Sequence, residues 1–253
     1  MRAPLAPPIV LCVPSDSAAI ASPEPPFATV EEALVDLRAG RFVVVLDDPN
    51  RKNQGDLTIA AELVTPDAVK FMATHAGGVI CLGLTPGRCD ELELPPMTRH
   101  SEASFGTAFT VSIEARDDIT TGISAHDRAR TIQVAADARA TAGDLVRPGH
   151  IFPLRAHPDG VLERRGHTEA AVDLTRLAGL APAAAICAIL DDDGDVADRA
   201  QLVRFCSRHG LKLVTVADVV AHRRRLEGSD DTASASPLLA RGAFPAAAHV
   251  WLA

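Results

Sequence analysis

The chain has 253 residues, of which 47% are apolar and 23% are charged, so it can bury a core of its own. A formal net charge of −8 disfavours a nucleic-acid or anionic-membrane partner, because phosphates and lipid headgroups repel an acidic surface. No apolar run approaches the roughly 18 residues that a membrane helix requires. Five cysteines without Cys-x-x-Cys spacing indicate a reducing, cytoplasmic setting rather than a disulfide framework.

Regular patterning is confined to the middle of the chain. Residues 1–27 are rich in Pro, Ala and Ser and predict a flexible leader, and residues 227–253 predict a flexible tail. Between them, the spacing of apolar residues predicts an α/β-type mixture in the following order: helix 30–40, strand 41–48, helix 65–78, strand 78–84, strand 109–115, helix 124–138, strand 150–156, strand 161–166, strand 183–190, helix 198–210, strand 212–216 and helix 216–228.

Two stretches combine groups that suit a phosphate. In TTGISAHDR (120–128), hydroxyl groups, among them Thr121, precede a helix N-terminus, where N–H donors favour an anion; ordinary capping by Ser124 explains the same pattern. In ERRGHTEAAVDL (163–174), arginine suits a phosphate and neutral histidine suits a divalent metal. We therefore favour a binding role over a solvated turn for the residues at its start: Arg164, Arg165, Gly166, His167, Thr168 and Glu169.

Two further stretches have chemistry that depends on their context. RPGHIFPLRA (147–156) places His150 at the start of a strand, where a structural role is as plausible as a catalytic one. DDPNRKNQGD (47–56) contains four groups that could bind a metal or a phosphate: Asp47, Asp48, Arg51 and Asp56. The alternative interpretation of this stretch is an acidic surface turn.

Taken together, these segments resemble 3,4-dihydroxy-2-butanone 4-phosphate synthase, the riboflavin-pathway lyase. The matching pieces cover residues 28–226 and are DDxxRxNxGD (47–56), GGVICL (77–82), SFGTAFTVSIEA (104–115), TTGISAxDR (120–128), RPGHIFPLRA (147–156), RGHTEAAVDL (165–174) and LAGLAPAAAIC (177–187). The resemblance implies a single α+β domain over 28–226, with a mixed sheet flanked by helices. It also implies a homodimer whose active sites lie near the subunit interface.

The resemblance further implies an activity and its residues. The family converts ribulose 5-phosphate to formate and a four-carbon ketone phosphate, using magnesium. Carried over by motif, Arg51, Asp56, Thr121 and the segment from Arg164 to Thr168 would line the sugar-phosphate site. His167 would be a metal ligand, and His150 would be one of two residues essential to catalysis.

Three positions depart from the family's pattern. The family loop reads R-E-N-E-G-D, and its two glutamates, the first a magnesium ligand, become Lys52 and Gln54 here. The family's second essential residue, a glutamate, falls on Ala188. Magnesium prefers hard oxygen ligands, so we expect no cofactor, and Mg²⁺ only if the family chemistry survives. An ammonium at Lys52 could replace the ion, which places Lys52 with His150 and Asp56 among the predicted catalytic residues; its alternative is a lysine turned to solvent.

Three functions are consistent with these residues. The first, which we rank highest, is a diverged enzyme that performs metal-independent enolisation, dehydration or isomerisation on ribulose 5-phosphate or a related phosphorylated ketose. The second is the synthase itself. The third is a non-catalytic homologue that binds a sugar phosphate or a partner.

Overall fold

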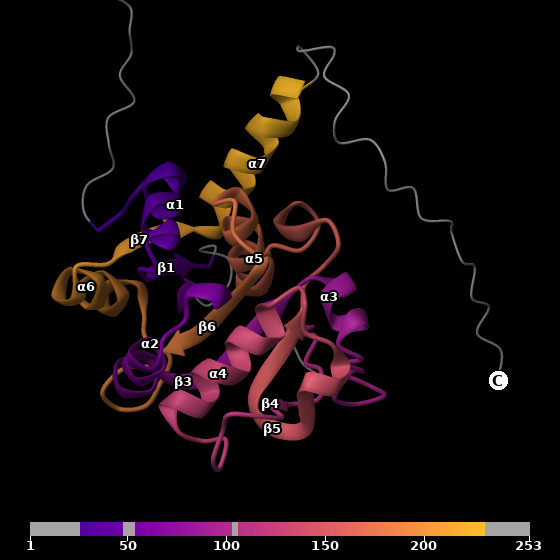
Figure 1. The fold of residues 1–253 in the computed structure, drawn as a ribbon. Coiled ribbons are helices and arrows are strands. Elements are labelled where there is room, and N and C mark those ends of the chain that lie inside the picture. The colour runs from indigo at the N-terminus through magenta and orange to yellow at the C-terminus, as the bar shows by residue number, and fades with distance from the viewer. Residues whose placement is uncertain (1–25, 48–53, 103–105, 231–253) are drawn as a thin grey trace, which may run out of the picture.

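A seven-stranded mixed sheet with helices on both faces forms the body of the computed structural model, which describes residues 26–47, 54–102 and 106–230 (Figure 1). The strand order is β4-β5-β3-β6-β2-β1-β7. The strands are β1 (Val43–Leu46), β2 (Gly55–Ala60), β3 (Gly77–Leu84), β4 (Ile113–Ala115), β5 (Leu145–Arg155), β6 (Ala183–Ile189) and β7 (Lys212–Thr215). This architecture confirms the predicted mixed sheet flanked by helices.

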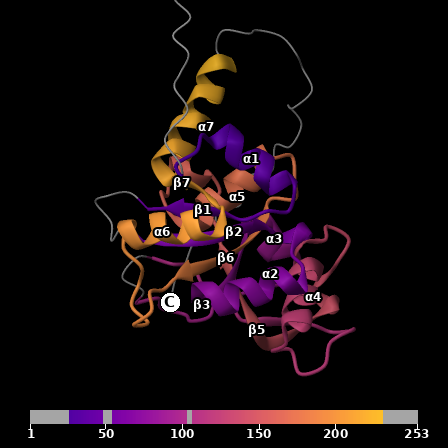
Figure 2. The ribbon, with the colours of Figure 1, turned by 90° about the vertical axis from the view of Figure 1, so that its left-hand side faces the viewer.

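The helices of the described ranges cover both faces of this sheet. They are α1 (Val30–Arg38), α2 (Pro66–Phe71), α3 (Pro86–Glu91), α4 (Ala125–Ala136), α5 (His167–Leu177), α6 (Arg199–His209) and α7 (Val216–Asp230). A π-helix, η2 (Met72–Ala76), continues α2, and three 3₁₀ turns complete the set: η1 (Ala61–Leu63), η3 (Ala142–Asp144) and η4 (Gly160–Leu162). In two perpendicular views α1, α5 and α7 lie together, apart from α2 and α4 (Figure 2).

Strand β1 shows why the sheet needs cover on both faces. All four of its residues are buried, and successive side chains of a strand point to opposite faces. Val43 and Val45 pack in the cluster formed with α1, α5 and α7. Val44 and Leu46 pack in the larger cluster, which includes residues of α2, α4 and α6. A run of apolar residues without alternation is what a strand buried on both faces requires.

Local signals set several helix boundaries where the sequence predicts them. Thr65 caps α2 by accepting a hydrogen bond from the amide of Ala68, and Pro66 is the first helical residue. Ser124 caps α4 in the same way, accepting from the amide of Asp127. At the other end of α6, Gly210 adopts a left-handed conformation with φ of 64°.

The structure corrects several predicted elements. Residues 161–166 do not form a strand: η4 and a turn occupy this segment, because the amide of Val161 donates to the carboxylate of Asp173 instead of to a strand ladder. In 109–115, only Ile113–Ala115 forms a strand, and Phe109 and Thr110 make isolated bridges. The prediction missed β2, α3 and α5.

The first and last residues that the structure describes are 26 and 230. Helix α7 continues to Asp230, beyond the boundary placed at residue 227. The rest of the predicted tail and residues 1–25 of the predicted leader lie outside the described residues. Among the helices of the described ranges, none has the length and apolar character needed to cross a lipid bilayer.

Candidate active site

A cavity of about 510 Å³ lies on the α5 face of the sheet. Alternation along β2 explains its polar floor: Leu57 and Ile59 point into the core on the opposite face, so Asp56 points toward α5. In the paired strand β6, Ala188 lies opposite Asp56. The lining residues are Asp47, Gln54, Asp56, Gly77, Gly78, Val79, Cys81, Thr107, Phe109, Leu154, Arg164, Gly166, His167, Thr168, Ile186, Ala188 and Leu190.

The N-terminus of α5 faces this cavity. Gly166 is the N-cap residue, and no side chain caps the helix there. The first helical residues, His167 and Thr168, both line the cavity. Because the first N–H groups of a helix lack partners within the helix and lie at the positive end of its dipole, this end of α5 favours an anionic group such as a phosphate.

His167 and Asp56 form the polar centre of the cavity. The Nδ1 atom of His167 lies 3.7 Å from Oδ1 of Asp56, and its Nε2 atom is buried without a hydrogen-bond partner. Burial raises the pKa of Asp56, nearby His167 opposes this rise, and the charge of Asp47 adds to it. A buried ring nitrogen without a partner is costly unless a ligand or an ion completes it, so His167 is positioned to contact a bound molecule.

Arg164 lines the cavity and is held there by an ion pair with a fully buried carboxylate. Its Nη1 atom donates to Oε2 of Glu169 at 2.6 Å, and Glu169 has no exposed side-chain surface. Gly166 allows this approach, because a Cβ atom there would lie 2.7 Å from Oε2 of Glu169. The ion pair holds the guanidinium group beside the N-terminus of α5, where both can act on one anion.

His150 and Thr121 do not line this cavity. His150 lies on β5, where its Nδ1 atom contacts Oε1 of Glu114. Leu154 lines the cavity from the same strand, and the separation of four positions along the strand corresponds to about 13 Å. Thr121 is exposed in the loop before α4. The predicted residues therefore form two groups within one chain.

The loop before α4 is organised around a buried aspartate. Oδ2 of Asp127 accepts hydrogen bonds from Oγ1 of Thr120 at 2.8 Å and from the amide of Gly122 at 3.0 Å. Burial alone would raise the pKa of Asp127, but hydrogen bonds from Thr120, Ser124 and Gly122 outweigh it and lower this pKa to about 2. The capping by Ser124 that the sequence suggests is present.

Asp127→Asn is expected to destabilise the protein at neutral pH, because the amide keeps the shape of the side chain and loses its charge. Since the folded-state pKa lies below the ordinary value of 3.8, the stabilisation is present above about pH 4 and is lost as pH falls toward 2. The difference in urea midpoint between variant and wild type should be large at pH 7 and clearly smaller at pH 2.5, where part of the folded-state charge is already protonated. Asp117→Asn, at an exposed position nearby, is the control; a difference as large at pH 2.5 as at pH 7 contradicts the account.

The described residues do not supply a complete set of ligands for a metal ion. His167 offers the unpartnered Nε2 atom, but no group of three or more His, Cys, Asp or Glu residues within the described ranges could hold an ion. Ala188 adds no ligand atom. The described part of the cavity does not form a metal site by itself.

Other predicted residues have separate outcomes. Arg51 and Lys52 lie outside the described residues. Arg165 is exposed and does not line the cavity. Cys81 does line it, and burial, followed by the charge of Asp56, raises the pKa of this thiol to about 12, so the thiol stays protonated and unreactive at neutral pH.

Sequence reasoning missed most of the apolar wall of the cavity. Val79, Thr107 and Phe109 all line it. These residues belong to stretches that resemble the synthase family, but nothing in their residue types indicates a site. Alternation along β3, where Ile80 and Leu82 belong to the opposite core, is the signal that could have identified Val79.

The fold and the site define an α+β protein with a polar, anion-favouring cavity between a mixed sheet and the N-terminus of a covering helix. The family model described as 3,4-dihydroxy-2-butanone 4-phosphate synthase matches residues 31–222. The chain belongs to this family.

Curated relatives and solved structures agree with this assignment. The chain is 54% identical over 201 residues to riboflavin biosynthesis protein RibBA of Salinispora arenicola, covering 79% of this chain and 48% of the relative. It is 48% identical over 210 residues to the 3,4-dihydroxy-2-butanone 4-phosphate synthase of Pseudomonas aeruginosa, covering 83% of this chain and 58% of that protein. The chain spans about half the length of the curated relatives it matches.

Among solved structures, a 3,4-dihydroxy-2-butanone 4-phosphate synthase in complex with two magnesium ions superposes with a TM-score of 0.75 at 46% identity. The match covers 80% of this chain and 99% of that chain. The two-domain synthase RibBX of A. baumannii also gives a TM-score of 0.75, at 50% identity over 78% of this chain and 58% of that one. Magnesium therefore fits the family, and the expectation that this chain needs no cofactor has no support.

Proposed function

We propose that the chain binds ribulose 5-phosphate in the cavity and catalyses the synthase reaction of riboflavin biosynthesis, releasing formate and a four-carbon ketone phosphate. The observation that carries this proposal is the grouping of Arg164, His167, Thr168 and Asp56 around the uncapped N-terminus of α5. The chain is about 50% identical to relatives named RibBA or 3,4-dihydroxy-2-butanone 4-phosphate synthase, which supports the synthase over the diverged enzyme that we ranked first.

The polar groups of the cavity suit the parts of a phosphorylated ketose. The amides at the start of α5 and the guanidinium group of Arg164 would hold the phosphate. The unpartnered Nε2 atom of His167 would contact an oxygen of the sugar or a bound ion. Asp56, whose pKa burial raises, is placed to exchange a proton with the ketose carbon chain, since general acid/base groups work best when their pKa approaches the ambient pH.

We further propose a homodimer in which each cavity is completed by the partner. His150 and Glu114 form a polar pair outside the cavity of their own chain, and the exposed Thr121 lies in the loop that follows β4. A symmetric dimer presents the same surface on both chains, so this group of one chain would meet the cavity of the other. The acidic chain and its metabolite-sized cavity support a cytoplasmic enzyme without nucleic-acid or membrane partners.

A second candidate function is favoured by one observation: Ala188, which lies opposite Asp56 on the cavity floor, carries no carboxylate. Losing a positioned acid/base group typically costs about 10²–10⁴-fold in rate. With Lys52 and Gln54 also replacing glutamates of the family's pattern, the chain would then bind the ketose and stop at metal-independent enolisation or isomerisation.

One experiment separates these functions. Purified full-length chain is incubated with ribulose 5-phosphate, with magnesium or with EDTA, while formate release and substrate binding are both measured. Formate that appears with magnesium and disappears with EDTA supports the synthase. Binding with a different product supports the diverged enzyme, and binding without turnover supports a non-catalytic homologue. Absence of ribulose 5-phosphate binding contradicts the synthase.

A further inference from the structure

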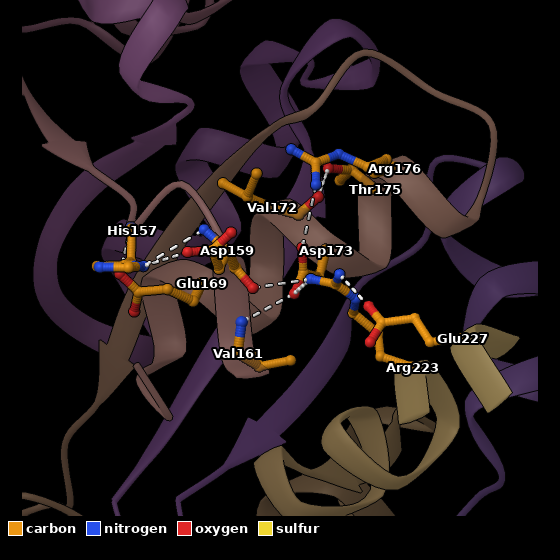
Figure 3. A network of polar contacts seen from close by, with 10 residues as sticks. All are labelled: His157, Asp159, Val161, Glu169, Val172, Asp173, Thr175, Arg176, Arg223 and Glu227. Carbon is orange, nitrogen blue, oxygen red and sulfur yellow. Dashed lines mark hydrogen bonds and ion pairs between the residues drawn. The ribbon is translucent and has the colours of Figure 1, made fainter. Parts of the chain in front are cut away.

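A buried charge network joins α7 to the segment that carries Arg164 (Figure 3). This segment, residues 157–166, connects β5 to α5 and is called the Arg164 loop below. Two carboxylates on one face of α5, Glu169 and Asp173, lie four residues apart, with 0% and 1% of their surface exposed. Such buried charges need partners, and these partners come from the loop and from α7.

Glu169 holds the two ends of the Arg164 loop. Its Oε1 atom accepts a hydrogen bond from the amide of His157 at 3.0 Å, and its Oε2 atom accepts one from Nη1 of Arg164 at 2.6 Å. The first contact binds the start of the loop, and the second binds the side chain that lines the cavity. The position of Arg164 is therefore linked to the path of the loop backbone.

Asp173 holds the middle of the same loop. Its Oδ2 atom accepts the amide of Val161 at 2.9 Å. Gly160 adopts φ of 60°, and a Cβ atom at that position would lie 2.3 Å from Oδ2 of Asp173. The loop backbone thus lies directly against this carboxylate, and a shift of Asp173 would move the loop.

Arg223 of α7 supplies a partly buried counter-charge for Asp173. Its Nη1 atom donates to Oδ2 of Asp173 and to the carbonyl oxygen of Asp159, each at 3.0 Å, so one nitrogen contacts both the carboxylate and the loop. Its side chain is 19% exposed. Arg176 also approaches Asp173, but at 3.6 Å and with 49% of its side chain exposed, so it can replace little of this contact.

We propose that Arg223 is a positioning residue for the cavity: acting through Asp173 and the Asp159 carbonyl, it fixes the Arg164 loop and so places Arg164 for the substrate phosphate. The inference rests on the proposed function for the identity of that ligand. It extends the determinants of the site to helix α7, none of whose described residues lines the cavity.

The first test needs no ligand. Hydrogen exchange is compared between wild type and Arg223→Gln, with Arg225→Gln as the matched control, because Arg225 lies on the same helix and is 67% exposed. In Arg223→Gln the amides of His157 and Val161 are expected to exchange at least about 10-fold faster, since local opening loses a charged hydrogen-bond partner. Exchange in β3 and in the control should be unchanged. Unaltered exchange of the Arg164 loop would overturn the proposal.

The second test asks whether the effect passes through Arg164. Affinity for ribulose 5-phosphate is measured for wild type, Arg223→Gln, Arg164→Ala and the double variant. Arg223→Gln is expected to weaken binding about 10-fold in the wild-type background and to have no further effect once Arg164 is alanine, because coupled residues are non-additive. Equal losses in both backgrounds would mean that Arg223 only stabilises the fold, and the proposal would fail.

Arg223→Lys keeps the experiment interpretable if Arg223→Gln does not fold. Lysine retains the charge but cannot present the arginine fork, so intermediate exchange of the loop and partial recovery of affinity are expected. A lysine variant that matches wild type in the exchange of His157 and Val161 contradicts a role for the dual contact of Nη1. If wild type binds no ribulose 5-phosphate, the proposed function fails, and the exchange data alone decide the role of Arg223.

Discussion

Replacing His167 by alanine is expected to slow formate release from ribulose 5-phosphate by at least about 10²-fold, the range typical for loss of an acid/base or ligand-contacting group. His167 lies at the centre of the cavity, with Nδ1 3.7 Å from Asp56 and a buried, unpartnered Nε2 atom. Alanine removes that nitrogen without adding bulk. His75→Ala, an exposed histidine outside the cavity lining, is the control and should keep wild-type activity.

His150→Ala is expected to cause a loss of similar size, although His150 does not line the cavity of its own chain. If the partner supplies this residue, co-expression of His150→Ala with His167→Ala produces heterodimers. Each heterodimer then has one site that lacks both histidines and one intact site. Random pairing then restores about a quarter of wild-type activity, because half of the dimers are mixed and each mixed dimer has one intact site of two. No recovery in a mixture shown to contain heterodimers would contradict a shared site.

Gly149→Ala is expected to lower the free energy of unfolding by at least about 2 kcal/mol, in the range for overpacking. A Cβ atom at Gly149 would lie 2.1 Å from the carbonyl carbon and oxygen of Ile113 and 2.5 Å from the amide nitrogen of Glu114. These are backbone atoms of β4, so no side-chain rotation relieves the clash. Strand β5 must separate from β4, and the neighbouring His150 must move from Glu114.

Gly87→Ala is the matched control for this substitution. Gly87 lies in α3, and no heavy atom lies within 4 Å of the Cβ position. Alanine is favoured over glycine in a helix by up to about 1 kcal/mol, so this variant should be as stable as wild type or more so. Urea denaturation of both variants measures the difference. A Gly149→Ala protein that unfolds at the wild-type midpoint would contradict the close approach of β4 and β5.

Elements with local signals were the ones that the sequence predicted best. The helix beginning at Pro66 and the helix capped by Ser124 have hydroxyl caps that act within three residues. By contrast, β2 was missed because Asp56 and Thr58 interrupt its apolar pattern, although every residue of the strand is buried. Only the neighbouring strand and the covering helix make those polar positions compatible with burial.

The candidate site likewise has one part that local sequence signals predicted and another that depends on packing. Arg164, His167 and Thr168 were predicted together because they lie within five residues of the sequence and are residue types that suit a phosphate or a metal. The separation of His150 and Thr121 from the cavity could not be predicted, since it depends on how β5 lies beside β3. The identity of the carboxylates that hold the Arg164 loop was also hidden, because a helical Asp or Glu near arginine usually indicates a solvated face.

By itself, the sequence determined the family of this protein, the mixed α/β class and the residues at the N-terminus of α5, because these depend on local motifs and on the period of apolar residues. Only the tertiary structure decided which strand faces share the cavity, that Asp56 is buried beside His167, and that Arg223 of α7 reaches Asp173. These features arise from pairing and packing between segments far apart in the chain, and local propensity carries no information about such contacts.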